Sequence, residues 1–447
     1  MNTTARHPDD ELSFDQWRQV VSSLPPLPRR VLEVPLGDAL GRRLAEPFIA
    51  PSPLPDVPCS AMDGFALRSA DLLRLRRLDG TRGDDVLISV ANDIPAGPGE
   101  PAPLAPGMAA RIMTGAPLPA GADLVVPVEQ TDSNPGDPLP ATVRISGDAV
   151  TVPHHHVRAV GEEIARGSRL AGPATLVGPG FMGVAAALGM ERLKVLAPQR
   201  IAVVATGDEL VRAEPHPADS SHRDDEGSLR YGEVRESNTR MLSAALAQLG
   251  HDVTRHVSGD HPRALLDLLD ALADEVDLMI TTGGIGAGSY DVVKAALGPD
   301  GRNSSRFAHL HMRPGAPQGC GVIGSTPVVH CPGTPVGALL GMHLFGRIVL
   351  REPPVITAMP LVPAGSGGLD GVDTRSGGDG ADGLRLRRHG LMCVAANLES
   401  TGVALTPGRR LAPYARANAV VLAGWGLTEG RTQILPGDLV NVALLGI

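Results

Sequence analysis

Residues 277–291, DLMITTGGIGAGSYD, are the stretch that decides the fold. The run DLMIT is short and apolar, which predicts a buried strand, and a helix is expected to begin near Asp291 and to end at Gly298. Four glycines lie before it, Gly283, Gly284, Gly286 and Gly288. Glycine lets a backbone approach a ligand closely, and N–H groups at the start of a helix bind phosphate. The loop therefore indicates a phosphate site, with a plain tight turn as the alternative.

The sequence on both sides alternates between strand and helix patterns over residues 200–350. RIAVVATG (200–207) predicts a buried strand, and a helix with an apolar face is expected between an N-cap at Ser237 and Gly250. HDVTRHV (251–257) is strand-like, and PRALLDLLDALADE (262–275) predicts a second helix. Such alternation predicts a mainly parallel sheet covered by helices on both faces. Ligands of these sheets bind at the carboxyl ends of the strands.

Carboxylates follow the predicted strands at this edge. Asp208 and Glu209 come after the first strand in the loop that begins with Thr206 and Gly207, Asp260 follows the second strand, and Asp291 follows the glycine loop. Mg²⁺ prefers oxygen ligands and bridges phosphates, so the shared edge predicts a magnesium site. For each carboxylate alone, the alternative is a helix cap or a solvated surface group.

The N-terminal part of the chain predicts a helix and a separate β-rich unit. Ser13 to Gln16 form a capping-box pattern, and Pro25 and Pro26 should stop the helix that follows. Residues 86–150 contain short apolar runs broken by Gly and Pro, which predicts a small all-β unit without a helix. Residues 157–197 predict a loop and a short helix ended by Gly189, expected to pack on the N-terminal helix.

The C-terminal part predicts more β-structure. Short β-like runs from residue 384 onward suggest a small barrel or sandwich. Residues 212–232 are charged and almost free of aliphatic side chains, and residues 363–383 are rich in Gly, Asp and Ser, so both are expected to be flexible. The fold class is therefore α/β with additional all-β parts in a multidomain chain.

Composition limits the classes of partner. The chain has 447 residues and a formal charge of −9, which argues against nucleic acid or an anionic membrane as the main partner. The four cysteines have no CxxC spacing, and the first residues do not resemble a signal peptide. A cytoplasmic protein is the resulting expectation. An anionic ligand would need backbone amides, local cations or a metal to compensate its charge.

Two further motifs have ordinary structural explanations. The turn at 60–64, SAMDG, is typical of a hairpin. The three consecutive histidines at 154–156 cannot all face one ion if they are extended, so an exposed loop is favoured.

Several stretches together resemble the molybdopterin molybdenumtransferase (MoeA/gephyrin E-domain) family. They are PLPDVPCSAMDGFAL (53–67), IMTGAPLPAGADLVVPVE (112–129), VRAVGEEIARGSRL (157–170), VVATGDEL (203–210), ESNTRML (236–242), MITTGGIGAGSYD (279–291), MRPGAP (312–317), VVHCPGTPVGALLGMHLF (328–345) and ARANAVVL (415–422). Each is weak alone, but their order covers nearly the whole chain.

The resemblance implies four domains and a reaction. Domain I would comprise 1–50 and 150–198, domain II the inserted β domain 51–149, domain III the molybdopterin-binding α/β domain 199–353, and domain IV the C-terminal β-barrel 354–447. The implied enzyme is a homodimer supplied by a molybdopterin adenylyltransferase-type protein. Its substrates would be adenylylated molybdopterin and molybdate, and the reaction would depend on Mg²⁺, transfer molybdenum to the dithiolene and release AMP.

The resemblance also assigns roles to individual residues. The catalytic residues would be Asp63, Thr114, Glu209, Asp260, Asp291 and Arg313, of which Glu209, Asp260 and Asp291 would hold the metal. The residues that bind the pterin and its phosphate would be Thr206, Gly207, Asp208, Gly283, Gly284, Gly286, Ser289, Pro314, Pro332 and Pro335.

This chain departs from the family pattern mainly at cationic and amide positions. Ala316 stands where the family has a lysine, His309 replaces a basic residue, and Thr334 and Cys59 each replace an asparagine. The carboxylates are retained. The leading hypothesis is an active molybdenum insertase. The alternatives are a weakened paralogue that acts as a molybdopterin-binding or scaffold protein, and an insertase with altered oxyanion specificity.

Overall fold

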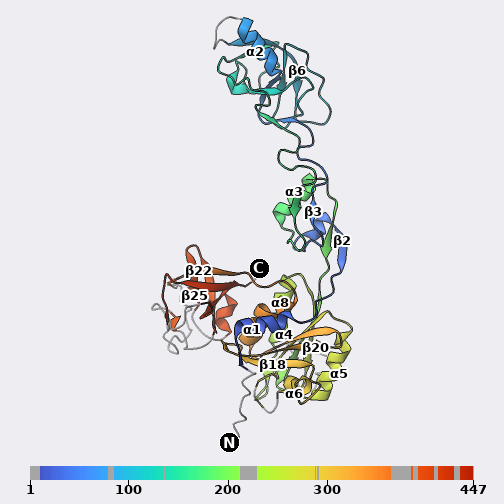
Figure 1. Ribbon diagram of the computed structural model, residues 1–447, viewed down its shortest axis with the longest axis vertical. Coiled ribbons are helices and arrows are strands. Elements are labelled where there is room, and N and C mark those ends of the chain that lie inside the picture. The colour runs from blue at the N-terminus through green and yellow to red at the C-terminus, as the bar shows by residue number, and fades with distance from the viewer. Residues whose placement is uncertain are drawn as a thin grey trace. The chain divides into compact units, whose positions relative to one another are not determined.

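The computed structural model describes residues 11–78, 85–134, 136–211, 229–286, 288, 291–363, 384–385, 391–406, 411–426 and 433–445. The chain divides into two compact units (Figure 1). Unit 1 comprises Met1–Arg29 and Ala197–Ile447, and unit 2 comprises Arg30–Leu196. Each unit is described by itself below. Within the described ranges, no helix is both long and apolar enough to cross a membrane.

Unit 1 is built on a seven-stranded sheet. In order across the sheet, its strands are β1 (Glu11–Leu12), β18 (Ser305–Leu310), β20 (Pro317–Ile323), β21 (Thr326–Cys331), β17 (Leu278–Thr282), β13 (Arg200–Thr206) and β16 (Asp252–Ser258). Strand β20 is antiparallel to both of its neighbours, and all other neighbouring pairs are parallel. The prediction of a mainly parallel sheet is confirmed.

Helices cover both faces of this sheet. They are α1 (Phe14–Ser22), α4 (Asn238–Gln248), α5 (Pro262–Ala273), α6 (Val292–Leu297), α7 (Pro335–Gly341), the π-helical turn η5 (Met342–Gly346) and α8 (Arg347–Val349). Successive strand residues point to opposite faces. Ile201 and Val203 of β13 therefore join a core with α1, α4, α7 and α8, whereas Ala202 and Val204 join a second core with α5 and α6.

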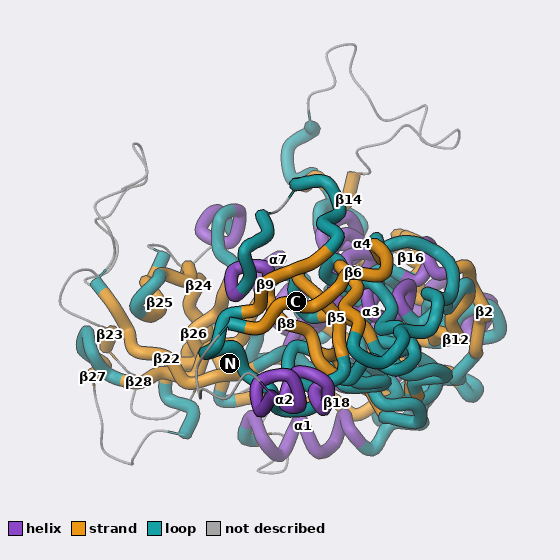
Figure 2. The backbone as a smooth tube through the Cα atoms, turned by 90° about the horizontal axis from the view of Figure 1, so that it is seen from above, coloured by secondary structure: helices purple, strands orange, loops and turns teal. Residues whose placement is uncertain are grey.

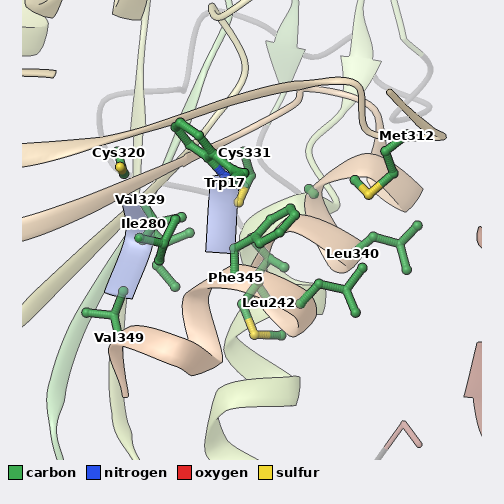
Figure 3. Packing of buried hydrophobic residues seen from close by; sticks show 14 of the residues in the cluster. Trp17, Leu242, Ile280, Met312, Cys320, Val329, Cys331, Leu340, Phe345 and Val349 are labelled. Atoms are coloured by element: carbon green, nitrogen blue, oxygen red, sulfur yellow. The ribbon is translucent and has the colours of Figure 1, made fainter. Parts of the chain in front are cut away.

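Helix α1 packs on the sheet of unit 1. The capping box is present, because Gln16 N donates to Ser13 Oγ and Ser13 N donates to Gln16 Oε1. Phe14, Trp17 and Val21 are buried in the same core as Ile280 and Phe345 (Figure 3). The expectation that this helix packs on residues 157–197 is wrong, because α1 belongs to unit 1, where it contacts α8 and its Phe14 ring packs against Phe345 and Trp425.

Two buried histidines make the stability of unit 1 sensitive to acid. Burial lowers the pKa of His330 to about 3 and that of His343 to about 4. The His330 ring lies between Thr281 Oγ1, 2.8 Å from Nδ1, and Ser305 Oγ, 2.9 Å from Nε2. Both histidines are neutral when folded and bind a proton near pH 6.5 when unfolded, so protonation favours the unfolded chain.

We expect the free energy of unfolding to be highest above pH 6.5. It should fall by about 1.4 kcal/mol per pH unit for each histidine as the pH drops from 6.5 towards 4. Urea unfolding at pH 7.5 and pH 5.0 measures the difference. His330→Gln, which keeps a polar side chain, should show a shallower pH dependence than the parent protein, and an unchanged slope would contradict this assignment.

A closed five-stranded barrel completes unit 1. Its strands are β22 (Ile356–Val362), β24 (Leu391–Glu399), β25 (Gly402–Leu405), β26 (Ala419–Ala423) and β28 (Leu439–Leu444), which lie together in Figure 2. The ring closes because β24 pairs with both β25 and β26. The sequence predicted a barrel or a sandwich for the C-terminal part, and the barrel is correct. The accompanying short elements are β23 (Leu384–Arg385), β27 (Gln433–Ile434) and the 3₁₀ turn η7 (Ala412–Ala415).

Unit 2 contains a five-stranded sheet. Its strands, in spatial order, are β8 (Leu124–Pro127), β5 (Gly64–Leu67), β7 (Met108–Ile112), β6 (Val86–Ile94) and β9 (Thr142–Ile145), accompanied by helix α2 (Ser69–Leu78) and the 3₁₀ turn η3 (Val128–Gln130). The β-strands predicted between 86 and 150 are present. Helix α2 precedes that range and was not predicted. Its N-terminus is held by Asp123, whose carboxylate accepts hydrogen bonds from the Ser69 N–H and hydroxyl.

The remainder of unit 2 is a set of short antiparallel pairs with one helix. The elements are β2 (Val31–Pro35), η2 (Leu36–Ala39), β3 (Phe48–Ile49), β4 (Cys59–Ser60), β10 (Val157–Arg158), β11 (Arg169–Ala171), α3 (Pro179–Ala187) and β12 (Arg192–Leu196). Gly189, at φ 74°, follows the end of α3 as predicted. The register of β2 and β12 sets Val31 opposite Leu196, so unit 2 begins and ends side by side. The finer division into four domains stays a prediction.

Candidate functional site

A cleft of about 720 Å³ lies in unit 1 at the carboxyl ends of the parallel strands. Residues that follow β13, β16, β17 and β21 line it, as expected for an open α/β sheet. The predicted site residues in its wall are Thr206, Gly207, Glu209, Asp260, Gly283, Gly284, Gly286, Asp291, Arg313, Pro314, Pro332 and Pro335. Most of the sequence prediction therefore converges on one cleft.

The glycine loop is packed tightly against the end of β13. Gly283 has φ 100°, and a Cβ atom there would lie 2.7 Å from the carbonyl oxygen of Thr206. Gly284 has φ 63° and would bring a Cβ to 3.0 Å from the backbone nitrogen of Val293 in α6. Only glycine fits both the backbone conformation and the space. The loop therefore keeps its backbone at the cleft wall, next to the first turn of α6.

The carboxylates around Asp260 repel one another. Asp260 N donates to Asp208 Oδ1 at 2.9 Å, and Asp208 N donates to Asp260 Oδ2 at 3.3 Å. Burial is the largest cause of a raised pKa at Asp260. The negative charges of Asp208, Glu209 and Asp291 raise it further. A bound cation would relieve this repulsion.

The three predicted metal ligands share the cleft without forming a closed cage. Glu209, Asp260 and Asp291 all line it. Among the residues that the structure describes, no three His, Cys, Asp or Glu side chains are close enough to hold one ion. Mg²⁺ is usually held by one or two carboxylates together with water and substrate phosphates, so this donor set fits a phosphate-bridged ion.

Residues 313–317 form another part of the cleft wall. Strand β19 (Met312–Arg313) pairs with β24, which fixes this segment to the edge of the barrel. The loop is closed by the Leu310 N–H, which donates to Ala316 O at 2.6 Å. Gln318 Nε2 donates to Gly315 O at 2.8 Å. The Ala316 methyl group thus lies in the cleft wall where the family has a lysine.

Charged side chains in the wall are mostly acidic. The acidic residues are Glu209, Glu236, Asp260 and Asp291, and the basic residues are Arg235 and Arg313. A phosphorylated ligand in this cleft therefore needs backbone amides and a cation in addition to the two guanidinium groups.

Sequence analysis missed the residues that open helix α4. Glu236, Ser237 and Asn238 all line the cleft. The predicted cap at Ser237 is wrong in its chemistry, because its side chain makes no capping hydrogen bond. The buried carboxylate of Glu236 accepts the Thr239 N–H at 2.8 Å and the Thr239 hydroxyl at 2.6 Å instead. The sequence signal that could have identified these residues is a run of three polar residues at the start of a helix on the ligand side of the sheet.

A short pair of hydrogen-bonded strands connects loop 207–211 to the segment that precedes α4. Strand β14 (Leu210–Val211) pairs in parallel with β15 (Val234–Arg235). Val234 N donates to Glu209 O at 2.8 Å, and Glu236 N donates to Val211 O at 2.9 Å. The backbone at Glu209 is therefore fixed, although most of the predicted flexible segment 212–232 lies outside the described residues.

Asp63 and Thr114 form a pair in unit 2. The Thr114 N–H and hydroxyl both donate to Asp63 Oδ1, at 2.6 Å and 2.8 Å. These two bonds, the backbone one first, hold the pKa of Asp63 below its usual range. The buried Ser60 supports the pair, because its carbonyl accepts the Gly115 N–H and its hydroxyl donates to Met62 O.

Asp208, His309 and Cys59 do not line the cleft. Asp208 and Asp260 each donate a backbone N–H to the other's carboxylate, and His309 lies on strand β18. Cys59 is buried in unit 2 opposite Arg158. Ser289 lies outside the described residues. Of the four departures from the family pattern, Ala316 and Thr334 line the cleft.

Comparison with known proteins identifies the family. Residues 12–189 match the family model described as MoeA N-terminal region (domain I and II), and residues 202–352 match the probable molybdopterin binding domain. Molybdopterin molybdenumtransferase 2 of Mycobacterium tuberculosis (strain ATCC 25618 / H37Rv) is 39% identical over 327 residues, which cover 72% of this chain and 75% of that protein. The chain belongs to the molybdopterin molybdenumtransferase family.

Two further comparisons extend over almost the whole chain. Molybdopterin molybdenumtransferase 1 of the same strain is 28% identical over 454 residues, with 97% of this chain and 99% of that protein covered. The crystal structure of a molybdopterin biosynthesis MoeA protein from Pyrococcus horikoshii has a TM-score of 0.71 and 22% identity, with the same coverage. The two Mycobacterium tuberculosis proteins are transferases by name, and the family acts in molybdenum cofactor biosynthesis.

Proposed function

We propose that this chain is a molybdenum insertase: it binds adenylylated molybdopterin and molybdate, cleaves the adenylate in a Mg²⁺-dependent step, and releases AMP with molybdenum left on the dithiolene. The observation that carries the proposal is the single cleft that joins Glu209, Asp260 and Asp291 to the Gly283–Gly284 backbone. Acidic side chains beside a glycine loop suit a ligand that has phosphate groups and a divalent cation.

Within this proposal, the protein supplies position and charge compensation. The backbone at Gly283 and Gly284 would bind the terminal phosphate of the pterin, and Arg313 would face the anionic end from the barrel side. Mg²⁺, held by two of the three carboxylates, would neutralise charge at the phosphate that leaves with AMP. Thr206 supports this fit, since its Oγ1 is buried in the wall and has no hydrogen-bond partner among the described residues.

The direct test is turnover with purified protein. Adenylylated molybdopterin, Mg²⁺ and molybdate are incubated with the protein, and AMP is measured by chromatography. We expect AMP release that requires both Mg²⁺ and Glu209, so that EDTA or Glu209→Gln lowers the rate by about 100-fold or more. Absence of AMP release from the parent protein, with tungstate as well as molybdate, would overturn the insertase proposal.

A second candidate function rests on Ala316. With a methyl group at the family's lysine position, the cleft wall offers less positive charge to an oxyanion, which favours a molybdopterin-binding or scaffold protein, or an insertase for another oxyanion. Turnover distinguishes the scaffold from either insertase. A scaffold would bind the pterin without releasing AMP from it.

Restoring the lysine separates the effects of the two altered cationic positions. We expect Ala316→Lys to lower the KM for molybdate by about tenfold, because a charge near the oxyanion is worth roughly 1–2 kcal/mol when partly desolvated. His309→Lys is the matched control: it adds the same side chain on β18, outside the cleft wall, and should change KM by less than about twofold. Equal effects of the two variants would contradict the placement of Ala316.

The assembly implied by the family stays part of the proposal. Unit 2 exposes Val31, Leu32, Leu40, Ile49 and Leu176, and helix α3 has Ala185 as its one buried residue. Exposed apolar side chains of this kind fit contact with a second copy of the chain. A cytoplasmic homodimer that receives its substrate from a molybdopterin adenylyltransferase-type protein is the arrangement we propose, and sedimentation at two concentrations tests the dimer.

A further inference from the structure

Asn238 connects three separate segments of the cleft wall. It is the first residue of helix α4, and its side chain is 9% exposed. Its Nδ2 group donates to Thr282 Oγ1 at 2.9 Å and to the carbonyl oxygen of Gly333 at 2.8 Å. Thr282 in turn donates its hydroxyl to the carbonyl oxygen of Pro332 at 2.8 Å. The end of β17 and the end of β21 are thus joined through one amide.

These bonds act where the two loops touch. The Gly283 N–H donates to Cys331 O at 3.1 Å, and a Cβ atom on Gly333 would lie 3.3 Å from the Cα of Gly283. The backbones at Gly283 and Gly333 are therefore in close contact, with no side chain between them. Nδ2 donates both of its hydrogens, one to each loop, which neither aspartate nor leucine can do.

We propose that Asn238 is a positioning residue that fixes the phosphate-binding loop at 283–284 against residues 332–335 of the cleft wall. The distance between the sites for the substrate's phosphate and for the oxyanion is thereby kept constant. The expected effect of Asn238 on catalysis rests on the proposed insertase function. Displacement of a reacting group by about 1 Å costs on the order of 100-fold in rate, so a shift between these loops should affect turnover more than binding.

Neighbouring threonines on β17 provide a matched pair of test variants. Thr282 bonds to Asn238 and Pro332 on the cleft side, whereas Thr281 bonds to His330 at 2.8 Å within the sheet. Both side chains are buried, so Thr282→Val and Thr281→Val each remove one buried hydroxyl from the same strand. Thr282→Ser keeps the hydroxyl and should restore the parent behaviour.

The expected results separate positioning from stability. Asn238→Leu and Thr282→Val should each lower kcat for AMP release by about tenfold to 100-fold with little change in KM, while Thr281→Val stays within about twofold of the parent. The two valine variants should lose similar amounts of thermal stability. The double variant Asn238→Leu/Thr282→Val should be about as slow as either single variant, because both substitutions break the same hydrogen-bonded connection between the two loops.

Amide hydrogen exchange tests the tie without turnover. In Asn238→Leu and Thr282→Val, the amides of Gly283 and Gly284 should exchange faster, and those at the end of β13 should not change. If the parent protein releases no AMP, the proposed function fails, and hydrogen exchange alone decides this inference. Unchanged exchange at Gly283, or equal kcat losses in the two valine variants, would overturn it. If Asn238→Leu does not fold, Thr282→Val and Thr282→Ser give the same decision.

Discussion

Gly283→Ala is expected to reduce AMP release by about 100-fold or more, the largest catalytic effect of any single methyl group in the cleft. The added Cβ would lie 2.7 Å from Thr206 O and 2.8 Å from Thr206 Oγ1, at a residue with φ 100°. Neither atom can move away easily, since both belong to the buried end of β13. The loop must therefore shift into the cleft, where the phosphate would bind. Steady-state AMP release at saturating substrate measures the loss.

Gly324→Ala is the control for the backbone conformation. Gly324 lies in the turn between β20 and β21 with φ 61°, and its nearest contact for a Cβ is the Ala273 side chain at 3.9 Å. Alanine there costs about 1–2 kcal/mol of conformational energy without a clash. Turnover of Gly324→Ala should remain near that of the parent. Comparable turnover in both glycine variants would show that the glycine loop does not touch the substrate.

Trp17→Ala should lower the free energy of unfolding of unit 1 by about 3–5 kcal/mol, the largest stability effect that we expect. Trp17 of α1 is fully buried in the core that contains Leu242, Ile280 and Phe345 (Figure 3). Its indole Nε1 has no hydrogen-bond partner among the described residues, so its contribution is apolar contact. Urea unfolding followed by circular dichroism gives the difference.

Trp425→Ala provides the comparison for Trp17→Ala. Trp425 is half-buried, donates its indole N–H to Asp15 at 3.1 Å and lies under the guanidinium of Arg18 at 5.7 Å. Its loss should cost about 1–2 kcal/mol, because Trp425 is only partly buried whereas Trp17 is fully buried. Each variant retains the other tryptophan as a fluorophore. A larger loss for Trp425 than for Trp17 would contradict the assignment of Trp17 to the centre of the core.

The sequence predicted the sheet well because its strands are buried on both faces. Continuous apolar runs such as RIAVVAT and LMITT, each followed by glycine, identify strand ends without knowledge of the partner strands. The carboxyl-edge rule then predicted that Glu209, Asp260 and Asp291 share a cleft. Local sequence patterns were sufficient here. The strands of a parallel sheet all run in the same direction, so the loops that follow them meet at the same edge.

The failures concern interactions between distant parts of the chain. The apolar stripe of α1 is compatible with any apolar surface, so the sequence did not specify α8, Phe345 and Trp425 as its partners. Asn238 was missed for a similar reason, since its role depends on Thr282 and Gly333, 44 and 95 residues away. The cap at Ser237 failed because the longer Glu236 side chain reaches the Thr239 N–H instead.

The insertion of unit 2 between α1 and the rest of unit 1 has a consequence for synthesis on the ribosome. Helix α1 ends at Ser22, whereas the core that buries it includes barrel residues as late in the chain as Ala443 of β28. At 5–20 residues per second, the nascent chain carries Trp17 and Phe14 without their complete core for on the order of 20–80 s. Unit 2, whose ends pair through β2 and β12, can fold during that interval. The emerging protein thus has its second unit in place while its first helix still exposes an apolar stripe that a chaperone can recognise.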